Sequence, residues 1–256
     1  MKQSTIVAAA LFLAGICLGG EPFKILSYNV HHCADLDNVR SEAAVAKVIA
    51  AEKARFVGVQ EMDEKTARVK GVDQPKELGR LTGMHATFAK GIPFQGGAYG
   101  VATLSREQPL SVKRIPLPGT EPRVLLLAEF QDCFFGTMHL DLAQKERLES
   151  LPIVRKAVEA AAASKPVFIC GDWNAKPDSP TMKQLGTFAK VLSTLKTSTF
   201  HGHSRNPVEI AHRGLVIDYI AVDLAHAKSV KVLDSKVTEE RHASDHAPVS
   251  VTLQIQ

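Results

Sequence analysis

Short apolar runs separated by polar turns recur along most of the chain, and this pattern predicts more strands than helices. Runs of about four to eight residues that are bounded by turn-forming residues are typical of strands. Several runs follow one another between residues 99 and 139 without a helical segment, which favours antiparallel pairing there. The expected strands span residues 23–29, 56–60, 85–89, 99–105, 112–115, 124–130, 133–139, 167–170, 216–222 and 249–255.

Apolar positions at helical spacing predict a small number of helices between these strands. Asp37 or Asn38 can cap the first of them. The longest contains Pro152, which should kink the helix or restart it after Ser150. The helices are expected shortly after residue 38 and at residues 75–81, 143–164 and 179–186.

Frequent strands and few helices favour an α/β fold in which two β-sheets lie inside a mixed α/β sandwich. A doubly wound parallel sheet fits less well, because the strands between residues 99 and 139 have no helices to connect them. No linker, repeat or low-complexity tract divides the chain. We therefore expect a single domain over residues 21–256.

The first twenty residues have the layout of a secretory signal peptide. Lys2 precedes an apolar run at residues 6–18, and two glycines follow that run. The run is too short to cross a bilayer comfortably. We interpret residues 1–20 as a signal for export to a secreted or periplasmic location, with no membrane span once it is removed. A lipid anchor at Cys17 and an uncleaved N-terminal anchor are the alternatives.

The composition limits the classes of binding partner but does not identify one. The 256 residues carry a formal net charge of +4, and 6% of them are aromatic. This mildly basic balance is compatible with phosphorylated substrates, but it lacks the clustered charge expected of a dedicated nucleic-acid-binding protein. Nucleic acid is therefore a partner that we do not favour, and we expect a monomer.

Removal of the signal peptide would leave three cysteines in a compartment that permits disulfides, namely Cys33, Cys133 and Cys170. Three cysteines form at most one intramolecular disulfide. No Cys-x-x-Cys pair is present, so the cysteines do not indicate a zinc site.

Polar side chains that suit metal-assisted phosphoester cleavage stand at the ends of the expected strands. A carboxylate pair such as Glu61 and an aspartate can hold a hard divalent cation through oxygen. Histidines at other strand ends can transfer protons, and no serine or cysteine nucleophile is required. The strand-end residues are Asn29, Glu61, His139, Asp172, Asn174, Asp218, Asp245 and His246.

Seven short motifs at these strand ends follow one another in an order that is more informative than any single motif. They are Ser27-Tyr28-Asn29, Gln60-Glu61, Tyr99-Gly100 through Leu104-Ser105-Arg106, Thr137-Met138-His139-Leu140, Gly171-Asp172-Trp173-Asn174, Ile217-Asp218-Tyr219-Ile220 and Ser244-Asp245-His246. In this order the chain resembles the endonuclease/exonuclease/phosphatase superfamily, which includes deoxyribonucleases, abasic-site endonucleases, neutral sphingomyelinases and inositol-polyphosphate phosphatases. The resemblance implies a four-layer α/β sandwich with two mixed, mostly antiparallel sheets flanked by helices.

The resemblance also implies a cofactor and its ligands. A Mg²⁺ or Mn²⁺ ion would be held by Glu61, with Asn29 and Asp245 nearby. Substrate contacts are expected from His31, His32, Tyr99 and Arg106.

Catalytic roles follow from the same resemblance. Asp172 and Asn174 would position or activate the attacking water, and Asp218 would orient His246. His139 and His246 would flank the scissile phosphate. The sequence does not say which of these two histidines protonates the leaving oxygen.

Two residues depart from the pattern of the superfamily. Val101 follows Gly100 where many relatives carry Asn, which would remove one substrate contact. Trp173 stands where Phe is more usual, and we interpret it as a packing change.

Histidines also occur in two close pairs, His31-His32 and His201 with His203. Neither pair has the cysteines or the helical spacing of a typical zinc site. We therefore favour substrate contact over a separate transition-metal site for His31 and His32.

The leading hypothesis is an exported, divalent-metal-dependent phosphoester hydrolase that acts with an activated water on a small or lipid-linked phosphoester. A secreted endonuclease of the same superfamily is the alternative, although few aromatic residues are present to grip nucleic acid. A noncatalytic binding module on the same fold is the competitor from another class. A serine esterase using Ser244 is a third reading, but adjacent residues on an extended chain point to different sides, which separates Ser244 from Asp245 and His246.

Overall fold

The computed structural model describes residues 20–202 and 215–256. The expected signal peptide lies outside the described residues except for residue 20, and so does His203. The elements are β1 (Phe23–Asn29), η1 (His31–Cys33), α1 (Glu42–Glu52), β2 (Phe56–Glu64), α2 (Gln74–Thr82), β3 (His85–Phe94), β4 (Gly97–Ser105), β5 (Ser111–Leu117), β6 (Arg123–Glu129), β7 (Phe134–His139), α3 (Gln144–Ala162), β8 (Val167–Asp172), α4 (Pro180–Leu185), β9 (Ala189–Val191), β10 (Asp218–Asp223), β11 (Val230–Val237) and β12 (Val249–Ile255).

Two six-stranded sheets form the interior. The first has the order β11-β12-β1-β2-β4-β3, and the second has the order β5-β6-β7-β8-β10-β9. Each sheet contains one parallel pair, β1 with β2 and β7 with β8, whereas the other neighbours pair antiparallel. A parallel pair needs a crossover connection, and α1 and α3 supply the two crossovers.

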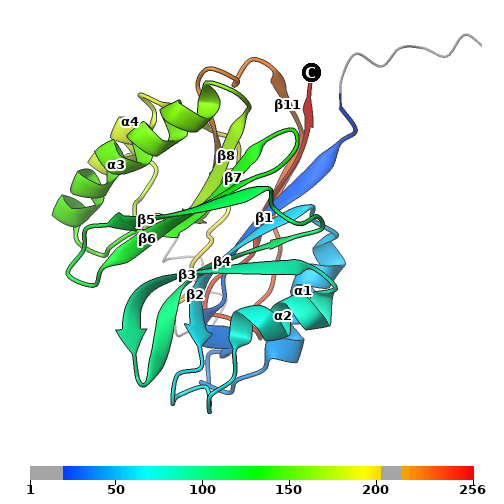
Figure 1. Ribbon diagram of the computed structural model, residues 1–256, viewed down its shortest axis with the longest axis vertical. Coiled ribbons are helices and arrows are strands. Elements are labelled where there is room, and N and C mark those ends of the chain that lie inside the picture. The colour runs from blue at the N-terminus through cyan, green and yellow to red at the C-terminus, as the bar shows by residue number, and fades with distance from the viewer. Residues whose placement is uncertain (1–19, 203–214) are drawn as a thin grey trace, which may run out of the picture.

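The helices cover the outer faces of the two sheets, as Figure 1 shows. The helices α1 and α2 pack on the first sheet through one buried cluster, while α3 and α4 pack on the second through another. A third cluster joins the inner faces, where Phe56 of β2 stacks on Phe135 of β7 with ring centroids 5.3 Å apart. This order of layers confirms the predicted four-layer α/β sandwich.

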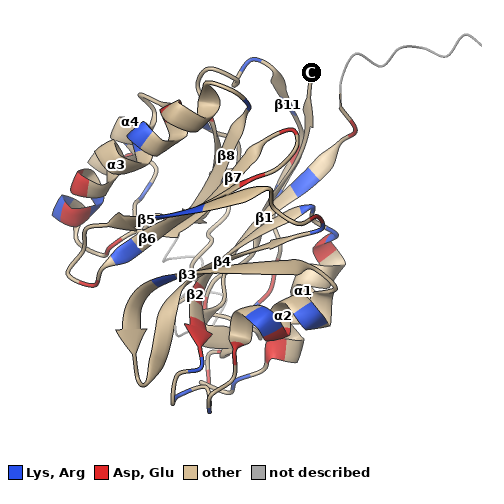
Figure 2. Ribbon diagram, in the orientation of Figure 1, with Lys and Arg blue, Asp and Glu red and all other residues tan. Residues whose placement is uncertain are grey.

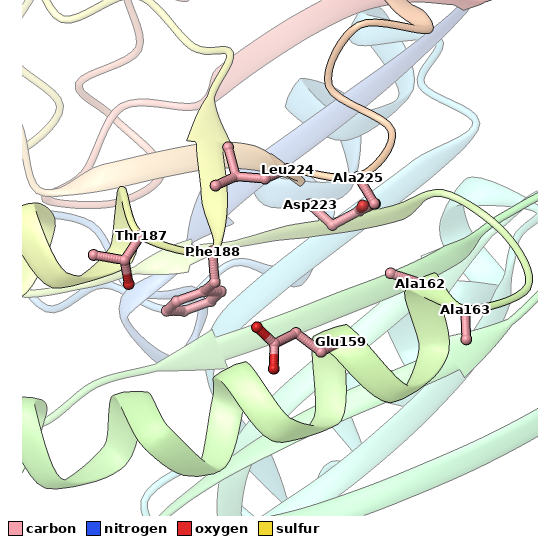
Figure 3. A pocket seen from close by; sticks show the side chains of 8 residues that line it. All are labelled: Glu159, Ala162, Ala163, Thr187, Phe188, Asp223, Leu224 and Ala225. Atoms are coloured by element: carbon pink, nitrogen blue, oxygen red, sulfur yellow. The ribbon is translucent and has the colours of Figure 1, made fainter.

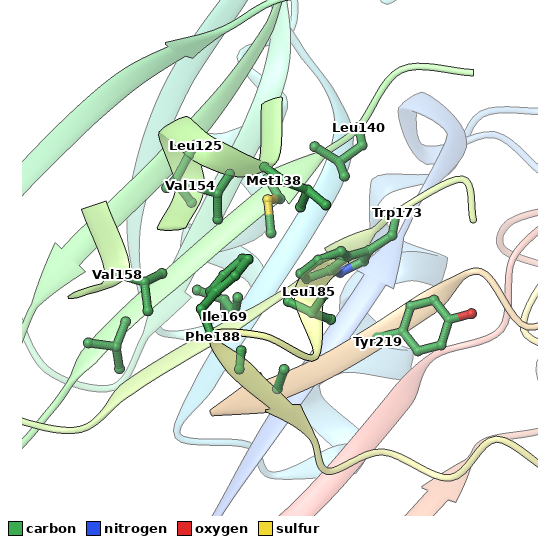
Figure 4. Close-up of a cluster of buried hydrophobic side chains, with 14 of the residues drawn as sticks. Leu125, Met138, Leu140, Val154, Val158, Ile169, Trp173, Leu185, Phe188 and Tyr219 are labelled. Carbon is green, nitrogen blue, oxygen red and sulfur yellow. The ribbon is translucent and has the colours of Figure 1, made fainter. Parts of the chain in front are cut away.

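Trp173 anchors the cluster beneath α3 (Figure 4). Its ring lies edge-on to Tyr219 with centroids 6.3 Å apart, and both side chains are buried. The Tyr219 hydroxyl donates to the carbonyl of Ala175 at 2.7 Å or that of Val216 at 2.6 Å. Trp173 is thus a packing residue, as the sequence predicts, and it fixes the chain directly after Asp172.

Helix boundaries follow local capping chemistry, with two corrections. The Asp73 side chain accepts from Lys76 N at the start of α2. The cap of α1 is Ser41 and not Asp37 or Asn38, because Asp35 ties the preceding residues into a separate turn. The helix α3 runs through Pro152 without a restart.

Two strands were missing from the sequence prediction, β9 and β11. Three residues are too few to show a period, and β11 is an edge strand with mostly exposed side chains. The strand β2 extends to Glu64, beyond the expected end at residue 60, because it continues through a bulge.

Charges of both signs are intermixed on the outer helices in Figure 2. Pairs such as Arg80 with Glu77 on α2 and Arg155 with Glu159 on α3 illustrate this mixing. Within the described ranges, no helix is long and apolar enough to cross a membrane. The cysteines that the structure describes, Cys33, Cys133 and Cys170, are buried and free.

Candidate active site

Three polar side chains meet where β7, β8 and β10 lie next to one another. The register pairs His139 with Asp172 across the parallel strands and Asp218 with Asp172 across the antiparallel ones. Directly paired residues project from the same face of a sheet, so their side chains converge. All three are buried. Sheet pairing therefore assembles the centre of the site.

The first sheet contributes Asn29 and Glu61. One extra residue of β2 between Val59 and Met62 forms a bulge against β4, and Glu61 within it has a φ of 58°. Bulges redirect a side chain relative to a regular strand. The redirected Glu61 Oε1 accepts a hydrogen bond from Asn29 Nδ2 at 2.9 Å.

Asn29 joins the two halves of the site. Its Nδ2 lies 2.9 Å from Glu61 Oε1 and 3.0 Å from Asp172 Oδ2, while its Oδ1 accepts from the backbone N–H of His31. An amide nitrogen has no lone pair to offer a cation. In this orientation Asn29 bridges the carboxylates by hydrogen bonds, and its amide would have to turn over to act as a metal ligand.

The converging side chains line a cavity of ≈ 510 Å³. Its apolar wall is formed by Phe200, Leu215 and Ile217. Its polar lining consists of His31, Glu61, Tyr99, Glu121, Arg123, His139, Asp172, Asn174, Lys176, Asp245 and His246.

His246 is held by a buried carboxylate. Its Nδ1 lies 2.9 Å from Asp218 Oδ2, and the ring of Phe200 packs on its imidazole with centroids 4.8 Å apart. Burial lowers the pKa of His246, but the charge of Asp218 and its hydrogen bond outweigh burial and raise the pKa to about 10. His246 is therefore an imidazolium at neutral pH.

Asp172 lies between the two histidines. Its Oδ2 is 3.4 Å from His139 Nε2 and 3.6 Å from His246 Nε2. Burial, followed by the like charge of Asp218, raises the pKa of Asp172 to about 7. A carboxylate with such a pKa is suited to accept a proton at neutral pH.

His139 differs from His246 in its charge. Burial, reinforced by the charge of Arg123, holds the pKa of His139 well below its usual range, so its ring is neutral. Arg123 Nη1 can only donate, and it lies 3.1 Å from His139 Nδ1. His139 Nε2 lies 3.0 Å from Asn174 Nδ2 and 3.4 Å from Asp172 Oδ2, so both ring nitrogens face a donor and the second also faces a carboxylate.

The end of β8 and the turn after it adopt unusual backbone conformations around Asp172. Gly171 has a φ of 153°, and a Cβ there would lie 1.9 Å from the carbonyl oxygen of Met138. Asn174 has a φ of 47°, and its backbone N–H donates to Asp172 Oδ1 at 2.9 Å. Strain of this kind persists only where the surroundings enforce it, and it is concentrated at functional sites.

Most of the residues predicted for the site are brought to this cavity. His31, Tyr99 and Asp245 line it together with the catalytic candidates. His32 lies one residue away, with its Nε2 3.3 Å from Asn38 Oδ1. The structure gives the positions of these residues, and their roles stay predictions.

Arg106 and Val101 do not line the cavity. Because β4 runs antiparallel to β2, its first residues lie beside Glu61 and its last residues lie beside Phe56, at the opposite end. Arg106 follows β4 there and donates to the carbonyl of Ala54, so it does not reach the cavity. Val101 is buried between the sheets, where it packs with Ala89, Val124 and Leu126.

Ser244 does not have the surroundings of a nucleophile. Its Oγ donates to the backbone carbonyl of Asn29 at 2.8 Å, and its side chain is fully buried. His246 directs its Nδ1 at Asp218 instead of at Ser244. The serine-esterase reading therefore loses its geometric basis.

Arg123 is the main functional candidate that sequence reasoning missed. Its guanidinium is 9% exposed, contacts His139 and Glu121, and lies at the cavity wall. The signal was its position at the start of the strand before β7. Antiparallel pairing of β6 with β7 puts that start next to the end that carries His139.

The donor set fits a divalent cation. The buried group Asp172, Asp218 and His246 has ligand atoms within 4.8 Å of one another and could bind a metal. The Glu61 carboxylate faces the same cavity. Carboxylate oxygens and imidazole nitrogen are ligands that Mg²⁺, Mn²⁺ or Zn²⁺ accept to different degrees.

A second cavity of ≈ 280 Å³ lies between α3 and the turn after β10 (Figure 3). Its lining includes Glu159, Phe188 and Asp223, but it has no histidine and no basic side chain. The Asp223 carboxylate accepts from Val167 N and the backbone of His226, which is a structural role. This cavity lacks the groups that phosphoester chemistry needs.

A four-layer sandwich with an acid- and histidine-lined cavity at its strand ends defines a class of hydrolytic phosphoesterases. The family model described as Endonuclease/Exonuclease/phosphatase family matches residues 26–246. The chain therefore belongs to this family, whose members are hydrolytic phosphoesterases. The predicted resemblance is confirmed.

Solved structures show the same fold. An endonuclease/exonuclease/phosphatase from Bacteroides vulgatus has a TM-score of 0.77 at 17% identity, covering 93% of this chain and 100% of that one. One from Beutenbergia cavernae DSM 12333 has a TM-score of 0.72 at 20% identity, covering 91% and 72%. The mannosyl-6-phosphatase from Bacteroides thetaiotaomicron VPI-5482 has a TM-score of 0.67 at 17% identity, covering 90% and 99%. Comparison with curated protein sequences gave no match.

Proposed function

We propose that this protein is a divalent-metal-dependent phosphoester hydrolase that attacks its substrate with an activated water. The observation that carries the proposal is the position of Asp172 between two histidines of opposite protonation state. An acid and a base with separated pKa values in one cavity are what hydrolysis at neutral pH requires.

Asp172 takes the proton of the water, because its pKa near 7 leaves a basic carboxylate available. His246, kept charged by Asp218, stabilises the developing negative charge and protonates the leaving oxygen. The neutral His139, held between Arg123 and Asn174, orients the reactants beside Asp172.

Arg123 and Lys176 supply the positive charge that a phosphate group needs. Arg123 is the more fixed of the two, because its guanidinium contacts both His139 and Glu121. A planar guanidinium can donate two hydrogen bonds to phosphate oxygens.

Glu61 is the residue that would hold the divalent cation. Asp245 faces the same cavity, and Asn29 would join once its amide turns over. A bound Mg²⁺ or Mn²⁺ would neutralise phosphate charge and polarise the phosphoryl oxygen.

A small or lipid-linked phosphoester is the preferred substrate class. The cavity of ≈ 510 Å³ is of the size that holds small ligands, and its apolar side of Phe200, Leu215 and Ile217 suits a nonpolar substituent. Mixed charges on the outer helices give little support for a nucleic-acid footprint. Endonuclease activity is the alternative within the same chemistry.

We further propose that the protein is exported and acts as a monomer. The export proposal rests on the layout of residues 1–20. Fractionation of producing cells, with N-terminal sequencing of the mature protein, tests it.

The functional test compares bis-p-nitrophenyl phosphate, p-nitrophenyl phosphate and plasmid DNA as substrates. Each is incubated with Mg²⁺ or Mn²⁺, with chelator, and with His246→Ala in place of the wild type. We expect metal-dependent hydrolysis that the variant loses. Activity that survives chelation would contradict the proposal, and absence of hydrolysis together with tight metal binding would favour a binding module.

A further inference from the structure

His31 and His32 lie in a turn that brings two adjacent imidazoles together. Adjacent residues of a regular strand point to opposite sides. Here both residues have left-handed backbone conformations, with φ of 46° and 47°, and their ring centroids are 4.5 Å apart. Such conformations are uncommon for residues other than glycine, although histidine adopts them more often than most.

The surrounding structure enforces this turn. Gln74, which is fully buried, donates its side-chain amide to the carbonyl oxygen of His32 at 2.6 Å. The carbonyl of Cys33 accepts from Ser41 N at 2.7 Å, and that of His31 accepts from Ala34 N at 2.9 Å. A strained turn that is held from several sides indicates a functional requirement for its side chains.

Glu61 completes a group of three with the two histidines. One ligand atom from each of His31, His32 and Glu61 lies within 4.8 Å of the others. Glu61 also has a left-handed φ, of 58°. Ligand atoms at about 2.0–2.1 Å from zinc lie at most about 4.2 Å apart, so small side-chain rotations are enough to close the group around one ion.

The hydrogen bond of His32 leaves one ring nitrogen, Nδ1, available. Its Nε2 faces Asn38 Oδ1, which can only accept, so Nε2 carries the proton and Nδ1 presents a lone pair. Nδ1 is buried and has no hydrogen-bond partner among residues 20–202 and 215–256. A metal-binding histidine is commonly oriented in this way by an oxygen on its other nitrogen.

The basic charge near His32 is partly offset by a carboxylate. Arg68 is the basic residue whose charge reaches His32. Its guanidinium is paired with the buried Asp63 through contacts of 2.6 and 2.9 Å. Asp63 offsets part of the charge of Arg68 at His32, and Glu61 adds a negative charge to the group.

We propose that His31, His32 and Glu61 form a binding site for a borderline transition metal of the Zn²⁺ class, beside the hydrolytic site. Imidazole with one carboxylate suits zinc, whereas Mg²⁺ prefers oxygen ligands alone. This proposal rests on the proposed function only because Glu61 belongs both to the hydrolytic cavity and to the group with His31 and His32. The sequence alone favoured substrate contact for the two histidines, and the position of Glu61 changes that preference.

Calorimetric titration of metal-free protein with Zn²⁺ and, separately, with Mg²⁺ tests the site without any substrate. His31→Asn and His32→Asn remove the imidazoles while keeping a residue that tolerates left-handed backbone. His85→Asn is the matched control, because His85 is exposed at the start of β3. We expect Zn²⁺ affinity to fall at least tenfold in both variants and to change less than twofold in the control, with Mg²⁺ affinity changing less than threefold in all.

Zn²⁺ affinity within twofold of the wild type in His32→Asn would overturn the site, since any zinc would then be bound by Asp172, Asp218 and His246. If the variants fail to fold, NMR spectra of the wild-type protein with Co²⁺ test the site instead. Paramagnetically shifted imidazole resonances from His31 and His32 support the site, and their absence overturns it. Hydrolysis with Mg²⁺ is measured separately, so failure here is distinguishable from failure of the proposed function.

Discussion

The Nδ1 atom of His246 lies 2.9 Å from the Oδ2 atom of Asp218, and both side chains are buried. The contact keeps His246 charged against the cost of burial. It also joins the loop before β12 in the first sheet to β10 in the second. The site therefore depends on the correct packing of the two sheets against each other.

Asp218→Asn tests this contact. Loss of the carboxylate charge should lower the pKa of His246, so that the imidazolium is lost at a lower pH. We expect kcat/KM to fall by about 10²–10⁴, the range of a general acid, with the alkaline limb of the pH profile moving to lower pH. The exposed Asp178→Asn serves as control. An unchanged alkaline limb in Asp218→Asn would show that Asp218 has only a structural role.

The pH profile of kcat/KM tests the assignment of acid and base. Asp172 must lose its proton to act as a base, so activity should rise as pH increases through about 7. His246 must keep its proton to act as an acid, so activity should fall as pH increases through about 10. The two apparent pKa values belong to the coupled site as a whole. Activity that falls between pH 6 and 8 would reverse the roles.

Arg123→Gln tests the phosphate contact. A hydrogen bond to a charged group contributes about 1.5–3 kcal/mol, which corresponds to a loss of about tenfold to hundredfold in kcat/KM. Loss of the nearby positive charge should also raise the pKa of His139, which NMR titration of its ring can follow. The control is Arg155→Gln on the outer face of α3. Equal activity of the two variants would contradict a phosphate contact by Arg123.

Gly171→Ala tests the strained turn. Gly171 has a backbone conformation that favours glycine, and an added Cβ would clash with the carbonyl oxygen of Met138. We expect the free energy of unfolding to drop by about 3 kcal/mol, as measured by denaturant titration. Gly186→Ala is the control, because its φ is −56° and its nearest contact is 3.4 Å away. Comparable stability of both variants would contradict the strain.

The acidic and histidine residues could be singled out from the sequence because they stand at strand ends within recognisable motifs, and the structure brings them together. The motif order carried this information for His139, Asp172, Asp218 and His246. Their contacts could not be predicted, because these depend on register, such as the pairing of Asp172 with both His139 and Asp218.

Arg106 and Arg123 show most clearly what the sequence could not predict. Arg106 ends a strand and Arg123 begins one, and sequence alone does not say which end of an antiparallel strand reaches the site. Pairing of β4 with β2 carries Arg106 away from the cavity, while pairing of β6 with β7 brings Arg123 to it. The bulge at Glu61 and the left-handed turn at His31 and His32 were equally hidden, since no glycine marks either of them.

The most direct test of the central claim is the rate of phosphoester hydrolysis by the wild type and by Asp172→Asn, each with Mg²⁺ or Mn²⁺ and after chelation. We predict that the wild type loses hydrolysis on chelation and regains it when metal is restored. Asp172→Asn should stay at least about 10²-fold slower at every metal concentration, because it lacks the base. Hydrolysis by Asp172→Asn at the wild-type rate, or hydrolysis that persists without metal, would contradict a metal-dependent reaction with Asp172 as the base.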